Sequence, residues 1–365
     1  MDLNYTMPQL LKALVDQGGS DLHISAFSAP RLRIHGKLLP LEVPSLNAEQ
    51  TKALCYSILT ENQKKVFEES LEIDLAFSVR GVARFRANIY NQKGAVNGAF
   101  RVITDAIPKL ENLDLPPILK KICHAHRGLF LTCGPTGSGK STTLAAMINY
   151  INENRHAHVV TVEDPIEYIH DHKNCLINQR EIGEDTNSFA RALKSALRQD
   201  PDVIMVGEMR DPETIALAIT AAETGHLVFG TLHTNSSIGA LNRIIDVFPP
   251  HQQGQIRTQL SFSLIGVLTQ SLIPSLKGGR VLGLELLIPN TGIKSMIRED
   301  KLQTIYSAMQ TGQEDTGMIT LNQSLVGLMK KRHINFETAI ELAYEKTELE
   351  ELANKAMFGP GPKKK

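Results

Sequence analysis

The sequence contains no tryptophan, and its four cysteines lie far apart without a Cys-x-x-Cys pair. That spacing is neither that of a disulfide framework nor that of a structural zinc site. We therefore expect reduced and mostly buried thiols at Cys55, Cys123, Cys133 and Cys175.

The sequence also lacks an excess of one charge and a long apolar run. Its 39 basic and 39 acidic residues give a formal net charge of zero, which argues against a protein that mainly coats nucleic acid. The most apolar stretch, residues 262–276, is interrupted by Ser, Thr, Gln and Pro, so it does not reach the roughly 20 residues of a membrane span. The N-terminus carries acidic residues and does not resemble a signal peptide. We expect a soluble, cytoplasmic protein.

The chain is long enough for two domains, and its pattern changes near residue 108. Helical patterns cover 7–16 and 48–70, and strand patterns cover 21–25, 30–41 with a turn at His35-Gly36, 72–79, 83–90 and 96–103. These indicate an α+β domain over residues 1–107. The proline-bounded segment 108–117 is the predicted linker.

From residue 118 to residue 365 the sequence predicts a second, α/β domain. Buried strand patterns at 128–134, 158–164, 202–208 and 227–233 alternate with helical patterns at 140–152, 188–198 and 212–224. This alternation predicts a parallel sheet covered by helices on both faces. Beyond Phe248 we expect mainly helices, ending in a disordered tail at 360–365.

One glycine-rich segment carries a specific phosphate-binding pattern between a predicted strand and a predicted helix. It consists of Gly134, Pro135, Thr136, Gly137, Ser138, Gly139, Lys140, Ser141 and Thr142. The glycines let backbone N–H groups face inward, and the following helix directs its positive end at the phosphates. We expect Lys140 to reach the β- and γ-phosphates and Ser141 to ligate Mg²⁺. The segment therefore predicts a site for ATP or another nucleoside triphosphate.

Two carboxylates follow the next predicted strands, Glu163 after residues 158–162 and Glu208 after residues 202–207. The carboxyl ends of parallel strands form the ligand crevice of such a sheet. A carboxylate there can hold Mg²⁺ or orient the attacking water. We assign Glu163 to the water and Glu208 to the Mg²⁺ side, and the reverse assignment stays open.

Two histidines, His226 and His233, flank the strand pattern at 227–232. At about 3.3 Å per residue they lie about 20 Å apart, and their odd offset sends them to opposite faces. They cannot share one metal ion. We expect His233 to lie at the phosphates with the carboxylates, and His226 to pack or transmit at the other end of the strand.

The ordered set of motifs resembles the secretion ATPase superfamily, and most closely its type IV pilus retraction ATPases, the PilT and PilU group. The motifs are GPTGSGKST, VVTVEDPIEYIH, DVIMVGEMRD and GHLVFGTLHTNS, with RALKSALRQDPD and GSDLHI as further similarities. The resemblance implies a PAS-like N-terminal domain, a RecA-like P-loop ATPase domain with a helical C-terminal region, and a homo-hexameric ring. It also implies a peripheral position at the cytoplasmic face of the inner membrane, with the pilus platform protein, the pilin assembly and a paralogous retraction ATPase as partners.

The resemblance also implies roles for arginines of the N-terminal domain. In the strand pattern 83–90, Arg84 and Arg86 share the face opposite the apolar residues, and in the family arginines on this strand reach the nucleotide. Arg101 is a further candidate contact. Arg191 and Arg198, seven residues apart on a predicted helix, are candidates for coupling, although a solvated helix face is the better explanation for them.

One motif departs from the family pattern Ala-Ile-Arg-Asn-Leu-Ile-Arg-Glu. The segment GIKSMIRE keeps Ile293, Ile297, Arg298 and Glu299 as candidate coupling residues, but has Lys294 and Ser295 where the family has Arg and Asn. Lysine does not reproduce a bidentate arginine contact. The departure leaves open whether the chain is a full retraction motor or an accessory paralogue.

Three other classes of protein share part of this pattern. Extension and secretion ATPases share the motifs, but are typically longer and carry a tetracysteine zinc insertion. A DNA-translocating motor would show a basic stripe. A scaffold that binds ATP without turnover does not need Glu163, Glu208 and His233.

We predict that Arg86→Ala lowers ATP turnover at least about tenfold and changes ATP affinity less than about threefold, because a charge-stabilising arginine acts mainly in the transition state. Phosphate release and nucleotide titration measure the two quantities. Equal losses in both would indicate plain ground-state binding.

Overall fold

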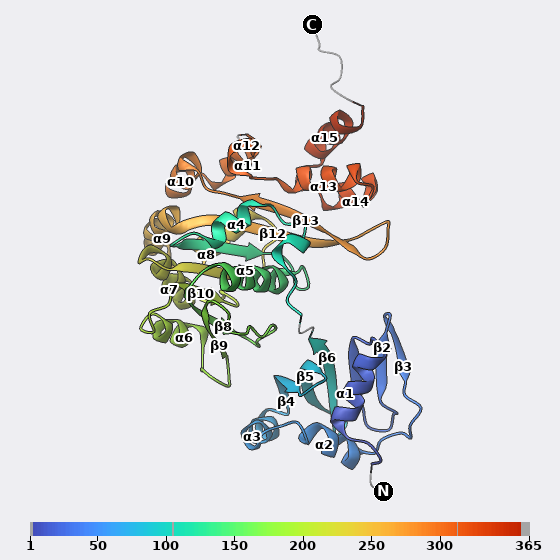
Figure 1. The fold of residues 1–365 in the computed structure, drawn as a ribbon. Helices are drawn as coiled ribbons and strands as arrows, with labels where there is room; N and C mark the ends of the chain where they lie inside the picture. The colour runs from blue at the N-terminus through green and yellow to red at the C-terminus, as the bar shows by residue number, and fades with distance from the viewer. Residues whose placement is uncertain (1–2, 104–105, 312, 359–365) are drawn as a thin grey trace. The chain divides into compact units, whose positions relative to one another are not determined.

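The computed structural model describes residues 3–103, 106–311 and 313–358 (Figure 1). They form two compact units, one of residues 1–106 with 165–169 and one of residues 107–164 with 170–365. The predicted tail at 360–365 lies outside the described residues.

The first unit is a six-stranded antiparallel sheet in the order β3-β2-β1-β6-β5-β4. Its strands are β1 Asp21–Ile24, β2 Arg31–Ile34, β3 Lys37–Pro40, β4 Glu72–Val79, β5 Ala83–Gln92 and β6 Ala95–Ile103, and its helices are α1 Met7–Asp16, α2 Ala48–Tyr56 and α3 Glu61–Ser70. One face of the sheet packs with the helices into a single apolar core, to which β5 contributes Phe85, Ala87 and Ile89. The opposite face of β5 carries Arg84 and Arg86, as its alternation predicts.

Two local predictions for this unit have different outcomes. The turn at His35-Gly36 joins β2 to β3, and both residues have positive φ, 48° and 81°, as a tight two-residue hairpin turn requires. The single helix expected over 48–70 is wrong, because the chain forms α2 and α3 there. Thr60 starts the second helix: its backbone N–H donates to the Gln63 side chain, and its hydroxyl accepts from the Gln63 N–H.

The second unit is built on a seven-stranded sheet in the order β13-β12-β7-β11-β10-β8-β9. The strands are β7 Gly128–Cys133, β8 His158–Glu163, β9 Leu176–Glu181, β10 Val203–Val206, β11 Leu227–Leu232, β12 Leu264–Pro274 and β13 Arg280–Leu287. Neighbouring strands are parallel except β13, which is antiparallel to β12. The predicted α/β class is confirmed.

The region after Phe248 is mainly helical, as expected, but it also contributes the strands β12 and β13. The apolar stretch at 262–276 contains β12, which joins the sheet next to β7. Its polar residues Thr269 and Gln270 are buried, and the Gln270 amide donates to the Thr143 hydroxyl over 2.9 Å. Because this contact comes from a distant helix, the local pattern does not reveal it.

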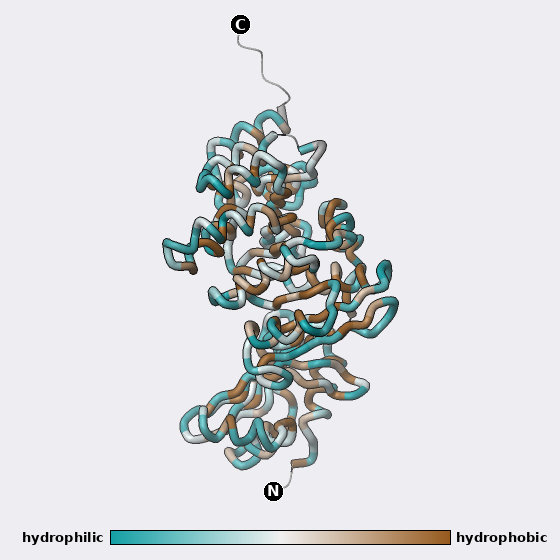
Figure 2. The backbone as a smooth tube through the Cα atoms, turned by 90° about the vertical axis from the view of Figure 1, so that its left-hand side faces the viewer, coloured by the Kyte–Doolittle hydropathy of each residue, from teal (hydrophilic) through white to brown (hydrophobic). Residues whose placement is uncertain are grey.

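Helices cover both faces of this sheet and extend beyond its β13 edge (Figure 1). They are α4 Ile118–Cys123, α5 Lys140–Asn154, α6 Phe189–Ala196, α7 Pro212–Glu223, α8 Ser237–Asp246, α9 Pro250–Ser263, α10 Thr291–Arg298, α11 Ile305–Met309, α12 Gln313–Thr316, α13 Leu321–Lys330, α14 Phe336–Leu342 and α15 Lys346–Phe358. One core contains residues of α4 and α5, and the other residues of α6 to α11. The helices α13 to α15 form a smaller cluster against Ile273. Along the backbone, hydrophobic segments lie mostly in the interior of the second unit, and hydrophilic segments occupy many of its outer turns (Figure 2).

The structure bears on two expectations from the composition, one about the cysteines and one about membrane-spanning helices. All four cysteines are free and buried, as expected. Burial raises the pKa of Cys133 to about 12, so this thiol is protonated at neutral pH. None of the helices in the described ranges is long and apolar enough to cross a membrane.

We predict that Phe229→Ala destabilises the second unit by about 3–5 kcal/mol, as for other buried phenylalanines. Phe229 is fully buried, and its ring meets that of Phe130 edge-on at 6.0 Å. Urea denaturation followed by circular dichroism measures the loss. The control Phe262→Ala, at a residue that is 64% exposed, should cost less than about 1 kcal/mol. A loss below that value for Phe229→Ala would contradict the assigned packing.

Candidate functional site

The predicted site residues of the second unit meet at one edge of the sheet. The glycine-rich loop follows β7, His233 follows β11, Glu208 lies two residues after β10, and Glu163 ends β8. Since β7, β11, β10 and β8 are consecutive parallel neighbours, their carboxyl ends lie side by side. The structure therefore brings the loop, both carboxylates and His233 together.

The glycines of the loop are required by its backbone. Gly134, Gly137 and Gly139 have φ values of +140°, +77° and +92°, which favour glycine. A Cβ on Gly134 would also lie 2.3 Å from the Gln270 carbonyl oxygen of β12. The loop therefore turns tightly against β12, with no room for a side chain at its first position.

The loop ends at the start of α5, whose first residue is Lys140. Lys140 is buried, and its Nζ donates to the carbonyl oxygens of Gly134 and Pro135 over 2.8 and 3.0 Å. The Ser138 hydroxyl is buried without a partner. The N-terminus of α5, the buried Lys140 side chain and the unpartnered Ser138 hydroxyl are together suited to bind a phosphate group.

Glu163 is fixed by its neighbours at the end of β8. Its side chain is buried, and its Oε1 accepts from the Thr161 hydroxyl over 2.7 Å and from the Gln179 amide over 3.1 Å. Two donors on one carboxylate oxygen restrict the orientation of the group. Gln179 was not among the predicted site residues, because β9 carries no buried apolar run that would predict a strand.

Glu208 and His233 contact each other, with 3.3 Å between His233 Nε2 and Glu208 Oε1. Glu208 also forms an ion pair with Arg210. The hydrogen bond and the charge of Glu208 raise the pKa of Arg210 above its usual value. Arg210 was not predicted as a site residue, although it lies in the same motif as Glu208.

Gly207 allows the end of β8, which carries Glu163, to approach the end of β10, which precedes Glu208. Its N–H donates to the Val162 carbonyl oxygen over 2.7 Å. A Cβ there would lie 3.0 Å from that oxygen and 3.2 Å from Glu163 Cα, closer than side chains normally come. The glycine therefore keeps the ends of β8 and β10 adjacent.

His226 lies at the opposite end of β11, away from this edge. Its Nδ1 lies 2.9 Å from the Ala221 carbonyl oxygen at the end of α7, and its own carbonyl accepts from Gly128 over 3.0 Å. These contacts are those of a packing residue. The two histidines are separated, as the strand length predicts.

The arginines of the first unit lie on the polar face of its sheet. Arg84 Nε donates to the Ile166 carbonyl oxygen over 3.1 Å, and Arg86 is exposed. Arg101 pairs with Asp21 over 2.8 Å. Burial raises the pKa of Asp21, but hydrogen bonds from Ser20 and Arg101 outweigh it, and the pKa lies below its usual value.

The coupling candidates are spread over the second unit. Ile293 and Ile297 are fully buried on α10, while Arg298 bonds the Ser295 hydroxyl over 2.9 Å and Glu299 pairs with Lys301.

The two arginines near α6 do not share one helical face. Arg191 is exposed on α6, but the helix ends at Ala196, so Arg198 lies beyond it. Pro201 follows closely and, with Asp200 at a φ of +54°, prevents the longer helix that was expected.

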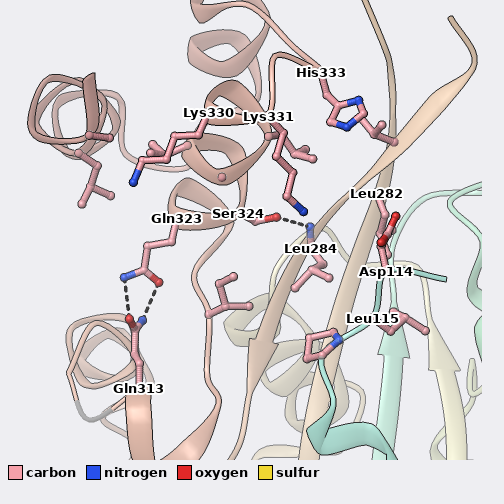
Figure 3. Close-up of a pocket in the computed structure, with 18 of the residues that line it drawn as sticks. Asp114, Leu115, Leu282, Leu284, Gln313, Gln323, Ser324, Lys330, Lys331 and His333 are labelled. Carbon is pink, nitrogen blue, oxygen red and sulfur yellow. Dashed lines mark hydrogen bonds between the residues drawn. The ribbon is translucent and has the colours of Figure 1, made fainter. Parts of the chain in front are cut away.

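A separate cavity of about 890 Å³ lies away from this edge (Figure 3). It is bounded by residues 114–117, β13, α13 and α15, and by the pairing of the Gln313 and Gln323 amides. None of the described residues that line it belongs to the glycine-rich loop, and neither Glu163, Glu208 nor His233 lines it. It is therefore distinct from the candidate site.

The chain is similar to several known proteins over nearly its whole length. The profile of a family described as "Type II/IV secretion system protein" matches residues 4–351. The chain is 49% identical over 335 residues to "Type IV pilus retractation ATPase PilT" of Pseudomonas aeruginosa, covering 92% of this chain and 97% of that protein. It is 42% identical over 333 residues to "Type IV pilus ATPase PilU" of the same organism, covering 91% and 87%. The crystal structure of "the Pilus Retraction Motor PilT and Bound ADP" superposes with a TM-score of 0.90 at 49% identity, covering 95% of this chain and all of that one.

We predict that Gly134→Ala weakens ATP binding at least about tenfold, because the new Cβ would force the loop away from Gln270. Titration with a fluorescent ATP analogue measures the affinity. The matched control is Gly137→Ala, which also has positive φ but open space around the position of the Cβ, so it should lose less than Gly134→Ala. Equal losses would show that φ alone, and not the contact with β12, determines the loop.

Proposed function

The chain belongs to the type II/IV secretion system protein family, and on that premise we propose that it is an ATPase that drives retraction of a type IV pilus. The observation that carries the proposal is the 49% identity over nearly the whole chain to a relative named as a pilus retraction ATPase. The edge that gathers the glycine-rich loop, Glu163, Glu208 and His233 supports it.

The nucleotide binds along the loop from Gly134 to Thr142. Its phosphates accept from backbone N–H groups and from Lys140 at the start of α5. Ser141 and Glu208 would hold Mg²⁺, which neutralises phosphate charge when it is bound. Hydroxyl and carboxylate oxygens are suitable ligands for this ion.

Glu163 orients the attacking water. Thr161 and Gln179 both donate to its Oε1, so they hold the carboxylate at the end of β8. Electrostatic catalysis depends on groups that are fixed before the reaction. Positioned in this way, Glu163 accepts a proton from the water that attacks the γ-phosphorus.

His233 reports whether the γ-phosphate is present. Its contact with Glu208 connects the ends of β10 and β11, so a displacement of one residue affects the other. Loss of the γ-phosphate therefore changes the position of His233 and of the segment that follows it.

The same proposal extends to assembly and movement. Arg84, Arg86 and Arg101 stabilise phosphate charge, and residues 1–107 and 118–365 move as two domains joined by 108–117. The chain works as a homo-hexamer at the cytoplasmic face of the inner membrane, bound peripherally to the pilus platform. Hydrolysis is converted into a rigid-body rotation that removes pilin from the filament.

A second candidate is an accessory motor that acts beside a main retraction ATPase. It is supported by the 42% identity to a PilU protein and by Lys294 and Ser295 in the motif at 292–299. Deletion of the gene in the host, followed by complementation and scoring of pilus retraction, separates the two. Loss of retraction on deletion, restored by complementation, supports the main motor, whereas retraction that persists after deletion supports an accessory role.

We predict that Glu163→Gln lowers phosphate release at least about a hundredfold and leaves ATP affinity within about threefold, because the amide keeps the shape of the side chain but cannot accept the proton. Phosphate release and nucleotide titration measure the two effects. Glu213→Gln, on an exposed carboxylate of α7 that pairs with Lys194, serves as the control and should remain as active as the original chain. Unchanged phosphate release in Glu163→Gln would reject the ATPase mechanism.

A further inference from the structure

The second unit contains a buried carboxylate that the proposed chemistry does not use. Glu285 lies on β13 and is 4% exposed, and burial raises its pKa. No Lys, Arg or His of the described residues forms an ion pair with it. A carboxylate that is buried without a cation requires other compensation.

Two helix N-termini supply that compensation. The N–H of Ser237, the first residue of α8, donates to Glu285 Oε1 over 2.7 Å. The backbone N–H of Leu321, the first residue of α13, lowers the pKa of the same carboxyl group. First-turn N–H groups have no partner within their own helix and carry positive partial charge. One side chain therefore connects the beginnings of two helices that are 84 residues apart in the sequence.

The sheet register places Glu285 beside the nucleotide site. It pairs with Thr269 of β12, Thr269 pairs with Cys133 of β7, and Cys133 pairs with Leu232 of β11. Cys133 directly precedes the glycine-rich loop, and Leu232 directly precedes His233. Glu285 thus shares one row of the sheet with the residues from which both phosphate-contacting segments start.

The hydrogen bond between Glu285 and the start of α8 restrains the segment that contains His233. Residues 233–236 run from the end of β11 to the start of α8. The sheet holds the first end of this segment, and the bond between Glu285 and Ser237 holds the second. Because the segment is only four residues long, a displacement of the α8 N-terminus changes the position of His233.

Further hydrogen bonds join β13 to the start of α13 on either side of Glu285. Leu286 and Ile319 exchange two backbone hydrogen bonds of 2.8 and 3.1 Å, and the Leu284 N–H donates to the Ser324 hydroxyl over 3.1 Å (Figure 3). The beginning of α13 is therefore fixed to β13 on both sides of Glu285. This helix packs with α14 and α15.

We propose that Glu285 is a positioning residue for ATP hydrolysis, which holds the N-terminus of α8 and thereby His233 in place and joins that segment to α13. The inference rests on the proposed ATPase function. Glu285 contacts neither the nucleotide nor the attacking water. It acts on His233 only through its hydrogen bond with the backbone N–H of Ser237.

The test measures kcat and KM for ATP hydrolysis by the full chain, together with its melting temperature. Glu285→Ala should lower kcat at least about tenfold and leave KM within about threefold, since the glycine-rich loop itself is unchanged. Glu285→Gln should recover kcat to within about threefold of the original chain, because its amide oxygen still accepts from Ser237. Should Glu285→Ala fail to fold, Glu285→Asp replaces it and should have a lower kcat than Glu285→Gln, since its carboxylate is retracted by one methylene.

The matched control is Glu348→Ala. Glu348 accepts from Tyr306, Gln310 and Asn322, so it stabilises the same C-terminal helices, and in the part of the chain that the structure describes it forms no hydrogen bond with α8. Its loss should lower the melting temperature but leave kcat within about twofold.

Three results would overturn the inference: an unchanged kcat in Glu285→Ala or its replacement Glu285→Asp, a rise of KM alone, or an equal loss of kcat in Glu348→Ala. If the original chain releases no phosphate at all, the proposed ATPase function fails, and the inference fails with it. An active original chain with an equally active Glu285 variant contradicts only the inference.

Discussion

The site depends on the parallel pairing of β7, β11, β10 and β8. Because these strands run in one direction and are neighbours in the sheet, the residues after each of them collect at a single edge. The glycine-rich loop, two carboxylates and a histidine come from positions up to 99 residues apart, between Gly134 and His233. A shift of any one strand by a residue would move its polar side chain away from the others.

Buried polar contacts fix this edge from behind. The Gln270 backbone lies against Gly134, and the Gln270 side chain bonds Thr143 in the first turns of α5. Thr161 and Gln179 orient Glu163. Hydrogen bonds of this kind are strong in an environment that excludes water, and they fix a geometry that apolar packing alone leaves adjustable. The strands β9 and β12, which the sequence did not predict, therefore determine how well the predicted residues are placed.

The sequence could predict the elements with strong local signals. Apolar strand runs and the glycine-rich motif locate β7, β8, β10 and β11, and the residue that follows each run identifies Glu163, Glu208 and His233. The sequence could not predict β12 as a strand, since Thr269 and Gln270 interrupt its apolar pattern and are satisfied only by distant residues. The contacts of Gln179 and Glu285 also join segments remote in the chain, and no local periodicity signals them. For α6, the expected helix was too long because the chain turns at Asp200 and Pro201.

The central claim is the division of roles between the two carboxylates, and a structure of the chain with Mg²⁺, ADP and aluminium fluoride tests it most directly. That complex imitates the transferring phosphoryl group and retains the attacking water. The account predicts that Glu163 lies within about 3.2 Å of this water and that Glu208 lies on the Mg²⁺ side with Ser141. A structure with Glu208 at the water and Glu163 at the ion would contradict it.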